Sequence, residues 1–124
     1  MAYDSNNIFA KIIRKEIPCR AVYEDDFCLA FHDLHPAAPV HVLVIPKCEA
    51  ESFHDFIIKA NQEFVVEFFK GVKQVAEMLD LEESGYRLIT NHGADALQSV
   101  KHFHVHLLGK AKLGALVAGD LYHS

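Results

Sequence analysis

Residues 40–46, VHVLVIP, form a nearly continuous run of apolar and mostly β-branched side chains. Such a run is typical of a β-strand that is buried on both of its faces. His41 lies near the start of the run, so we expect its imidazole in a buried or cleft environment rather than in open solvent. The chain has 124 residues, enough for one domain with a substantial core and too few for two. We therefore expect a single domain over residues 1–124.

The remaining segments contain both helical and extended patterns. Apolar residues at the start of NIFAKIIRKEIP predict a short amphipathic helix that ends before Pro18. Four further strands are expected in segments rich in β-branched and aromatic residues: two around a turn within 20–33, one at 86–91, and a last long one at 98–109. These patterns predict an α+β fold, with a mostly antiparallel sheet of about five strands, one long helix and one short helix.

Residues 52–81 have a helical pattern in two pieces. Ser52 with Asp55 resembles a capping box, and Asn61 is suited to cap the second, longer piece. The expected core stripe of that piece consists of Val65, Phe68, Phe69, Val72, Ala76 and Leu79. Four more apolar residues widen the arc beyond one face: Phe64, Val66, Val75 and Met78. A helix with so wide an apolar arc buries two sides, which predicts a homodimer; a helix deep in its own core is the alternative.

Composition narrows the class of protein and of partner. Hydrophobic residues make up 51% of the chain, 23% are charged, and the net charge of −5 comes without a basic run. Binding to nucleic acid is not expected, because phosphate backbones require clustered Lys and Arg. No apolar stretch approaches the roughly 18 residues of a membrane span, and the first residues do not resemble a signal peptide. The three cysteines lack CxxC spacing, which favours a reducing, cytoplasmic setting over a disulfide framework.

Residues 101–109, KHFHVHLLG, place three histidines at every second position. On a strand His102, His104 and His106 point to one face, and the apolar residues between them point to the other. At a rise of about 3.3 Å per residue the outer two start about 13 Å apart, so three rings can converge on one small anion. Three interpretations are open: a solvated face with coincidental histidines, a zinc site, and phosphoryl or nucleotidyl transfer.

Phosphoryl or nucleotidyl transfer is the interpretation that the residues favour. The sequence offers neither thiolates at metal spacing nor another obvious cluster of ligands, which weakens the zinc site. Neutral imidazole is a good nucleophile near pH 7, and neighbouring imidazoles can donate hydrogen bonds to phosphoryl oxygens or protonate the leaving group. His104 is the expected nucleophile because it has an imidazole neighbour on either side. Gln98 and Ser99 are candidates for a polar cradle.

The segment QSVKHFHVHLLG resembles the signature of the histidine triad (HIT) superfamily. Three more segments, IFAKIIRKEIP, YEDDFCLAFHDLHPAAPVHVLVIPK and GYRLITNHGADALQSV, resemble in order and spacing the Hint branch of purine nucleoside phosphoramidases. The resemblance extends over residues 7–109. It implies a HIT-like homodimer that hydrolyses an AMP-type purine nucleotide through a covalent nucleotidyl-histidine, with no metal and no cofactor.

The resemblance also implies roles for individual residues. His104 is the nucleophile, His106 contacts the phosphate, and His102 orients the nucleophilic ring. His41, beside the scissile group, and Ser99 complete the catalytic set. In the nucleotide site Asp33 with Leu34 holds the ribose hydroxyls, and four apolar residues, for which a core role is the alternative, form a slot for the purine. The implied nucleotide contacts are Ile8, Phe9, Ile17, Phe31, His32, Asp33, Leu34, Asn91, Leu97, Gln98, Ser99, His104, Val105 and His106.

The chain departs from the family pattern in three places. Asn7 and Ala10 stand where some relatives carry a zinc-binding CxxC, so that zinc site is expected to be missing. Leu97 replaces a Gly found in many relatives, which is expected to stiffen or narrow the phosphate loop. The tail from residue 110 shares a Leu-Gly start with some bacterial-type relatives and then diverges, which affects the leaving-group side. Ordinary surface positions are expected for His35, His54, His92 and His123.

The expected activity is hydrolysis of purine nucleoside 5′-phosphoramidates or adenylates to the nucleoside monophosphate. Two alternatives are a dinucleoside polyphosphate hydrolase and a nucleotide-binding regulatory or scaffold protein with incidental turnover.

Overall fold

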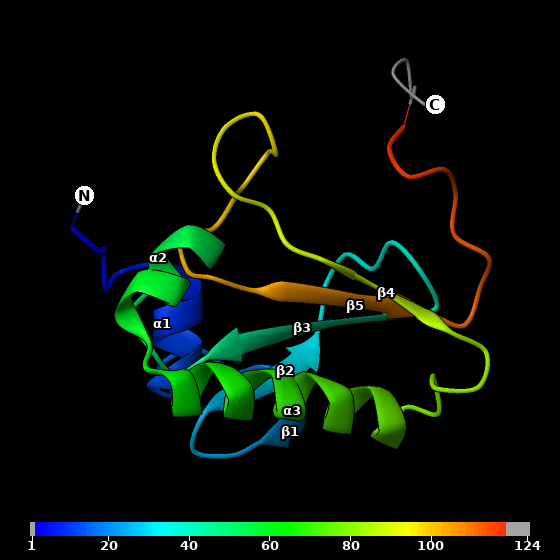
Figure 1. Ribbon diagram of the computed structural model, residues 1–124, viewed down its shortest axis with the longest axis horizontal. Helices are drawn as coiled ribbons and strands as arrows, with labels where there is room; N and C mark the ends of the chain where they lie inside the picture. Colours follow the sequence, from blue (N-terminus) through cyan, green and yellow to red (C-terminus); the bar gives the residue numbers. More distant parts are fainter. Residues whose placement is uncertain (1, 119–124) are drawn as a thin grey trace.

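Five antiparallel strands form one sheet in the order β1-β2-β3-β5-β4, in a computed structural model that describes residues 2–118 (Figure 1). Within that range the chain order is α1 (Ile8–Ile13), β1 (Ala21–Glu24), β2 (Cys28–His32), β3 (Val40–Pro46), α2 (Phe53–Lys59), α3 (Gln62–Met78), β4 (Tyr86–Ile89) and β5 (Val105–Gly109). The predicted α+β class and antiparallel sheet are confirmed. His123 lies outside the described residues.

The strand β3 lies in the middle of the sheet and is buried on both faces, as its apolar run predicts. On one face Val42 and Val44 pack in a cluster with α3. On the other face Leu43 and Ile45 pack against α1. The two helices therefore cover opposite faces of the sheet, and the α1 face is the one that carries the histidines, because His106 pairs with Leu43 in the register of β3 with β5.

The helical region is divided into α2 and α3, as the two-piece pattern of residues 52–81 predicts, so the described residues contain one helix more than the long and the short helix of the expected fold. Ala60 has an extended backbone, and the side chain of Asn61 accepts the Phe64 N–H and caps α3 as predicted. The predicted capping box does not form: Ser52 makes no capping hydrogen bond, and Asp55 accepts the N–H of Glu51 instead. None of the helices in residues 2–118 combines the length and apolarity needed to cross a membrane.

The core stripe of α3 differs from the prediction at two positions. Val75 is fully buried, whereas Phe69 is 37% exposed and lies at the edge of the stripe. Close packing against β2 sets this orientation, because a Cβ on Gly71 would lie only 2.7 Å from the Sγ of Cys28. The helix face that carries Gly71 and Phe68 is therefore the one pressed onto the sheet.

The last strand is shorter than predicted and begins at Val105, so residues 98–104 are not part of it. The N–H of Phe103 donates to the carbonyl of Ala50, and the Thr90 hydroxyl donates to the carbonyl of His104. Because Ala50 and the Thr90 hydroxyl are not part of the sheet ladder, residues 103 and 104 do not belong to β5. The alternation of faces nevertheless continues: Phe103, Val105 and Leu107 enter the core beneath α3.

Candidate active site

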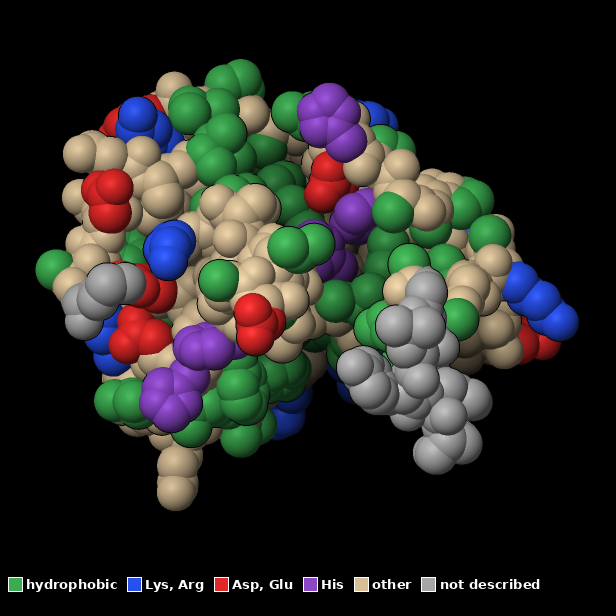
Figure 2. Space-filling model, turned by 90° about the horizontal axis from the view of Figure 1, so that it is seen from above, with side chains coloured by type: hydrophobic (Ala, Val, Ile, Leu, Met, Phe, Trp, Pro, Cys, Tyr) green, Lys and Arg blue, Asp and Glu red, His purple; other side chains and the backbone are tan. Residues whose placement is uncertain are grey.

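The triad histidines meet His41 of β3 on the α1 face of the sheet. Figure 2 shows histidine side chains at the floor of a hollow with largely hydrophobic walls and an acidic side chain beside them. The hollow is a cavity of about 310 Å³, and His104 and His106 both line it. Their rings lie 5.1 Å apart in an edge-to-face arrangement.

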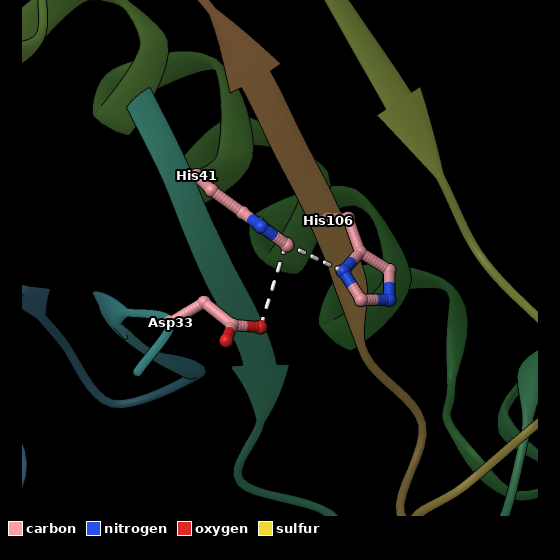
Figure 3. A group of neighbouring side chains, drawn as sticks. All are labelled: Asp33, His41 and His106. Carbon is pink, nitrogen blue, oxygen red and sulfur yellow. Dashed lines mark hydrogen bonds and ion pairs between the residues drawn. The ribbon is translucent and has the colours of Figure 1, made fainter. Parts of the chain in front are cut away.

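The hydrogen bonds of His41 and His106 fix which nitrogen carries a proton in each ring. The backbone N–H of Ala37 donates to Nδ1 of His41, so the proton of the neutral His41 ring is on Nε2. That Nε2–H donates to Nδ1 of His106 at 2.9 Å (Figure 3). The proton of neutral His106 is therefore on Nε2, which is the nitrogen left over to serve a ligand as a donor.

In His104 the proton is on the other ring nitrogen, Nδ1. Its Nδ1 lies 2.7 Å from the carbonyl oxygen of His102, and only a protonated nitrogen can hydrogen-bond to a carbonyl. Nε2 of neutral His104 then carries the lone pair. The cavity is thus lined by one imidazole with a free lone pair and by a neighbouring imidazole with an N–H to donate.

His102 lies behind the cavity and is fully enclosed, with 1% of its surface exposed. Its Nε2–H donates to the carbonyl of Pro46, and its Nδ1 lies 2.6 Å from the hydroxyl of Tyr3. The main-chain carbonyl of His102 therefore holds the His104 ring, while the ring of His102 is held by residues that the sequence analysis did not single out.

Burial keeps the four imidazoles neutral at pH 7. Burial lowers the pKa of His102 to about 4, and burial together with the neighbouring His104 and His41 rings lowers the pKa of His106 to about 4. Burial also lowers the pKa of His104 and of His41, although the carboxylate of Asp33 acts in the opposite direction on both. Each ring therefore keeps the single proton assigned by its hydrogen bonds, and Nε2 of His104 stays available.

These pKa values predict a loss of stability in mild acid. Between about pH 6.5 and pH 4 the unfolded chain binds protons on His102 and His106 and the folded chain does not, so the free energy of unfolding falls as the pH falls. The slope is at most about 1.4 kcal/mol per pH unit for each such histidine. Urea unfolding at pH 7, 6 and 5 measures it, with the exposed His54→Ala as the control that leaves the slope unchanged. Equal stability at pH 7 and pH 5 would contradict the prediction.

Asp33, His41 and His106 lie together, with one ligand atom of each within 4.8 Å of the others. Oδ2 of Asp33 is 3.5 Å from Nε2 of His41, and Figure 3 shows both contacts of that nitrogen. The distances suit a metal ion, but the hydrogen-bond direction does not, because the Ala37 N–H leaves Nε2 of His41 protonated and without a lone pair. The group fits a hydrogen bond from His41 to His106 with the Asp33 carboxylate beside it. A metal-free reaction stays a prediction.

The cavity brings together most of the residues that the resemblance implies for nucleotide binding. The predicted residues that line it are Ile8, Phe9, Ile17, Phe31, His32, Asp33, Leu34, Ser99, His104 and His106. Sequence reasoning missed several other lining residues, among them Cys19, Arg20 and His35. His35 was expected to be an ordinary surface residue; it is exposed and also borders the cavity.

Four predicted contacts do not present a free side chain to the cavity. Val105 packs into the core beneath α3 and does not line the cavity. Asn91 donates to the carbonyl of Ala96. The amide of Gln98 accepts from Gly93 and donates to two carbonyls, so it organises the loop that carries Ser99. The role of these residues in ligand binding stays a prediction.

Leu97, the fourth, has a left-handed backbone with φ 58° and a side chain that is 85% exposed. The side chain projects into solvent and does not narrow the loop. A glycine is less strained in this conformation, which accounts physically for the glycine expected at this position in many relatives.

Comparison with known proteins identifies the family of this chain. The HIT domain family model matches residues 14–113. A HIT-like protein of Azospirillum brasilense is 44% identical over 115 residues, covering 93% of this chain and 94% of that protein. The purine nucleoside phosphoramidase of Escherichia coli is 40% identical over 111 residues, covering 90% of this chain and 92% of that enzyme. A solved HIT family hydrolase from Legionella pneumophila has a TM-score of 0.81 at 37% identity, over 90% of this chain and 98% of that one. The chain therefore belongs to the HIT family, as its histidine triad predicts.

Proposed function

We propose that this protein hydrolyses purine nucleoside 5′-phosphoramidates or adenylates to the nucleoside monophosphate through a nucleotidyl intermediate on His104. One observation carries the proposal: the hydrogen bonds leave a lone pair on Nε2 of His104 and an N–H on Nε2 of His106 beside the same cavity. A nucleophile and an oxygen-stabilising donor are the two groups that displacement at phosphorus requires. The name of the Escherichia coli relative supports the substrate class.

The reaction proceeds in two displacements. In the first, the lone pair of Nε2 forms the bond to phosphorus, and the bond from phosphorus to the leaving group breaks. Nδ1 keeps its proton and its bond to the His102 carbonyl, so the intermediate is an N-phosphorylated imidazolium. In the second displacement water attacks phosphorus, the P–N bond breaks with its electrons returning to Nε2, and one proton is released. The His106 N–H donates to a non-bridging oxygen in both steps.

The leaving group determines whether a further proton is needed. An acyl adenylate loses a carboxylate, which leaves with the bonding electrons and takes up no proton at neutral pH. An amine has to gain one proton, and neutral imidazoles do not act as acids at pH 7. The proton therefore comes from the substrate nitrogen or from solvent.

The cavity has a place for each part of a purine nucleotide. The phosphate lies at Ser99, His104 and His106, and the purine lies among the apolar residues of α1 and β2. Asp33 is suited to the ribose, because its Oδ1 is held by the His35 N–H while the side chain stays 20% exposed. A carboxylate can accept hydrogen bonds from both sugar hydroxyls.

The function is tested by comparing turnover of adenosine 5′-phosphoramidate, its 2′-deoxy analogue and a dinucleoside polyphosphate. We expect the phosphoramidate to be the best substrate and the 2′-deoxy analogue to have a higher KM. Preference for the dinucleoside polyphosphate would identify the other hydrolase class. Tight binding of AMP without turnover of any of the three would identify a nucleotide-binding protein. The free thiols of all three cysteines fit the cytoplasmic setting that we propose for it.

We further propose that the protein is a homodimer joined through α3 and β4. A hollow between these two elements is lined by Phe69, Val72, Ala76, Tyr86 and Leu88, together with the charged residues Lys73, Glu77 and Glu82. Phe69 is 37% exposed and Leu88 is 45% exposed in the single chain. β4 is also an edge strand, with one side free of partners within the sheet. An apolar groove continuous with a free strand edge suits a second copy related by two-fold symmetry.

Phe69→Glu is expected to convert the dimer to a monomer without unfolding the chain, because it places a charge in an apolar interface. Light scattering at micromolar concentration is expected to give about 28 kDa for the wild type, twice the 14.0 kDa of one chain, and the single-chain mass for the variant. Ile58→Glu, on an exposed part of α2, is the matched control that leaves the mass at the dimer value. A wild-type mass of one chain would refute the dimer. Phe68 is unsuitable for this test because it is fully buried within the chain.

A further inference from the structure

The segment that precedes α1 contacts the triad from behind. The hydroxyl of Tyr3 lies 2.6 Å from Nδ1 of His102, although the two residues are 99 positions apart. Their rings also meet edge to face, with centroids 5.7 Å apart. The segment is held in place by local hydrogen bonds, since Asn7 donates to the carbonyl of Asp4 and Arg14 donates to the carbonyl of Ser5. Tyr3 is therefore an ordered partner of a buried catalytic-site histidine.

The direction of the hydrogen bond follows from the other nitrogen of His102. Nε2 lies 2.9 Å from the carbonyl oxygen of Pro46, so it carries the proton of the neutral ring. Nδ1 is then an acceptor, and the Tyr3 hydroxyl is the donor. Burial raises the pKa of Tyr3, so the hydroxyl keeps the proton that it donates.

The two hydrogen bonds hold the His102 ring at opposite ends. Pro46 lies at the end of β3, and Tyr3 belongs to the N-terminal segment, so the ring cannot turn without breaking one of these contacts. The carbonyl of the same residue accepts Nδ1–H of His104 at 2.7 Å. A displacement of His102 therefore changes the orientation of His104 directly.

We propose that Tyr3 is a positioning residue of this active site: its hydroxyl fixes the His102 ring and, through the His102 carbonyl, keeps His104 in the orientation and tautomer that leave Nε2 free. Tyr3 does not line the cavity, so it acts through His102 rather than on the substrate. The kinetic consequence rests on the proposed function, whereas the contact with His102 does not.

Tyr3→Phe removes the donor and retains the ring, and it separates positioning from general stability. A buried acceptor left without its donor corresponds to about a tenfold change in rate, so we expect kcat to fall about tenfold while KM changes little. Tyr23→Phe is the matched control. It removes a hydroxyl that donates to Oδ2 of Asp25 at 2.8 Å on the α3 side of the sheet, and we expect it to leave kcat unchanged.

Imidazole ¹⁵N chemical shifts, measured against pH, test the contact without any substrate. In the wild type we expect the proton of His102 on Nε2 and a titration midpoint far below that of an ordinary histidine. In Tyr3→Phe the midpoint is expected to rise, because the neutral ring loses the donor that stabilises it, whereas Tyr23→Phe leaves it unchanged. If Tyr3→Phe matched Tyr23→Phe in both kcat and the His102 midpoint, the proposal would be overturned. If the midpoint rose but no phosphoramidate were hydrolysed even by the wild type, the contact would stand and the proposed function would fail.

Discussion

His104→Ala is expected to abolish the covalent nucleotidyl-enzyme and to lower turnover by several orders of magnitude. The variant removes the lone pair on Nε2 that forms the bond to phosphorus. His106 presents an N–H at its remaining nitrogen, so it cannot take over the attack without a change of tautomer. Loss of a covalent nucleophile removes the reaction path itself rather than one stabilising contact. Rapid quench followed by mass spectrometry of the trapped species measures both the adduct and its rate.

Two further measurements show whether the loss is chemical. AMP binding by His104→Ala is expected to stay close to the wild-type value, because Asp33, Ser99 and the apolar wall are unchanged. His54→Ala is the matched control: it removes an exposed imidazole from α2, and turnover is expected to stay at the wild-type level. An adduct on His102 or His106 in the wild type, or appreciable turnover by His104→Ala, would show that the nucleophile is a different residue.

The sequence predicts the central strand of the fold better than the points where other strands and helices begin or end. The apolar run of β3 predicts burial on both faces, because no solvent-exposed strand tolerates Val42, Leu43, Val44 and Ile45 in succession. The start of β5 is not predictable in the same way. Residues 102–104 keep the alternation of a strand, and only tertiary hydrogen bonds to Ala50 and Thr90 take their backbone out of the ladder. The helix break at Ala60 is likewise marked only by the cap that follows it.

In the candidate site, too, some residues can be predicted from the sequence and others cannot. Residue type and spacing suffice to select the triad and to suggest Ser99, and family resemblance adds His41 and Asp33. The partners that orient them lie far away in the sequence and have no motif: Ala37 and Pro46 contribute only backbone atoms, and Tyr3 is a tyrosine near the N-terminus. Gln98 illustrates the converse, because its polar side chain in a loop suggests a ligand contact, whereas its amide is fully used by backbone groups of Glu51, Gly93 and Val100.

His41→Ala is expected to lower the rate of nucleotidyl transfer by about 10²–10³-fold, the usual effect of losing one preorganised oxygen-stabilising donor. His41 does not line the cavity, so the effect acts through His106. The Nε2–H of His41 is the group that keeps Nδ1 of His106 unprotonated at 2.9 Å. Without it the proton of His106 is free to move to Nδ1, which leaves a lone pair facing the phosphoryl oxygens. Repulsion then replaces a hydrogen bond at the point where negative charge develops.

His41→Gln distinguishes this mechanism from a loss of packing. A glutamine side chain provides an amide N–H that can donate to Nδ1 of His106, so we expect it to recover a large part of the activity that the alanine variant loses. Single-turnover rates of the wild type and both variants give the comparison, and imidazole ¹⁵N shifts report the protonated nitrogen of His106 in each. The adduct on His104 is expected in all three proteins, formed slowly in His41→Ala. If glutamine and alanine were equally impaired while His106 kept its proton on Nε2, His41 would act by another route, and its hydrogen bond to His106 would not be what prepares the phosphate site.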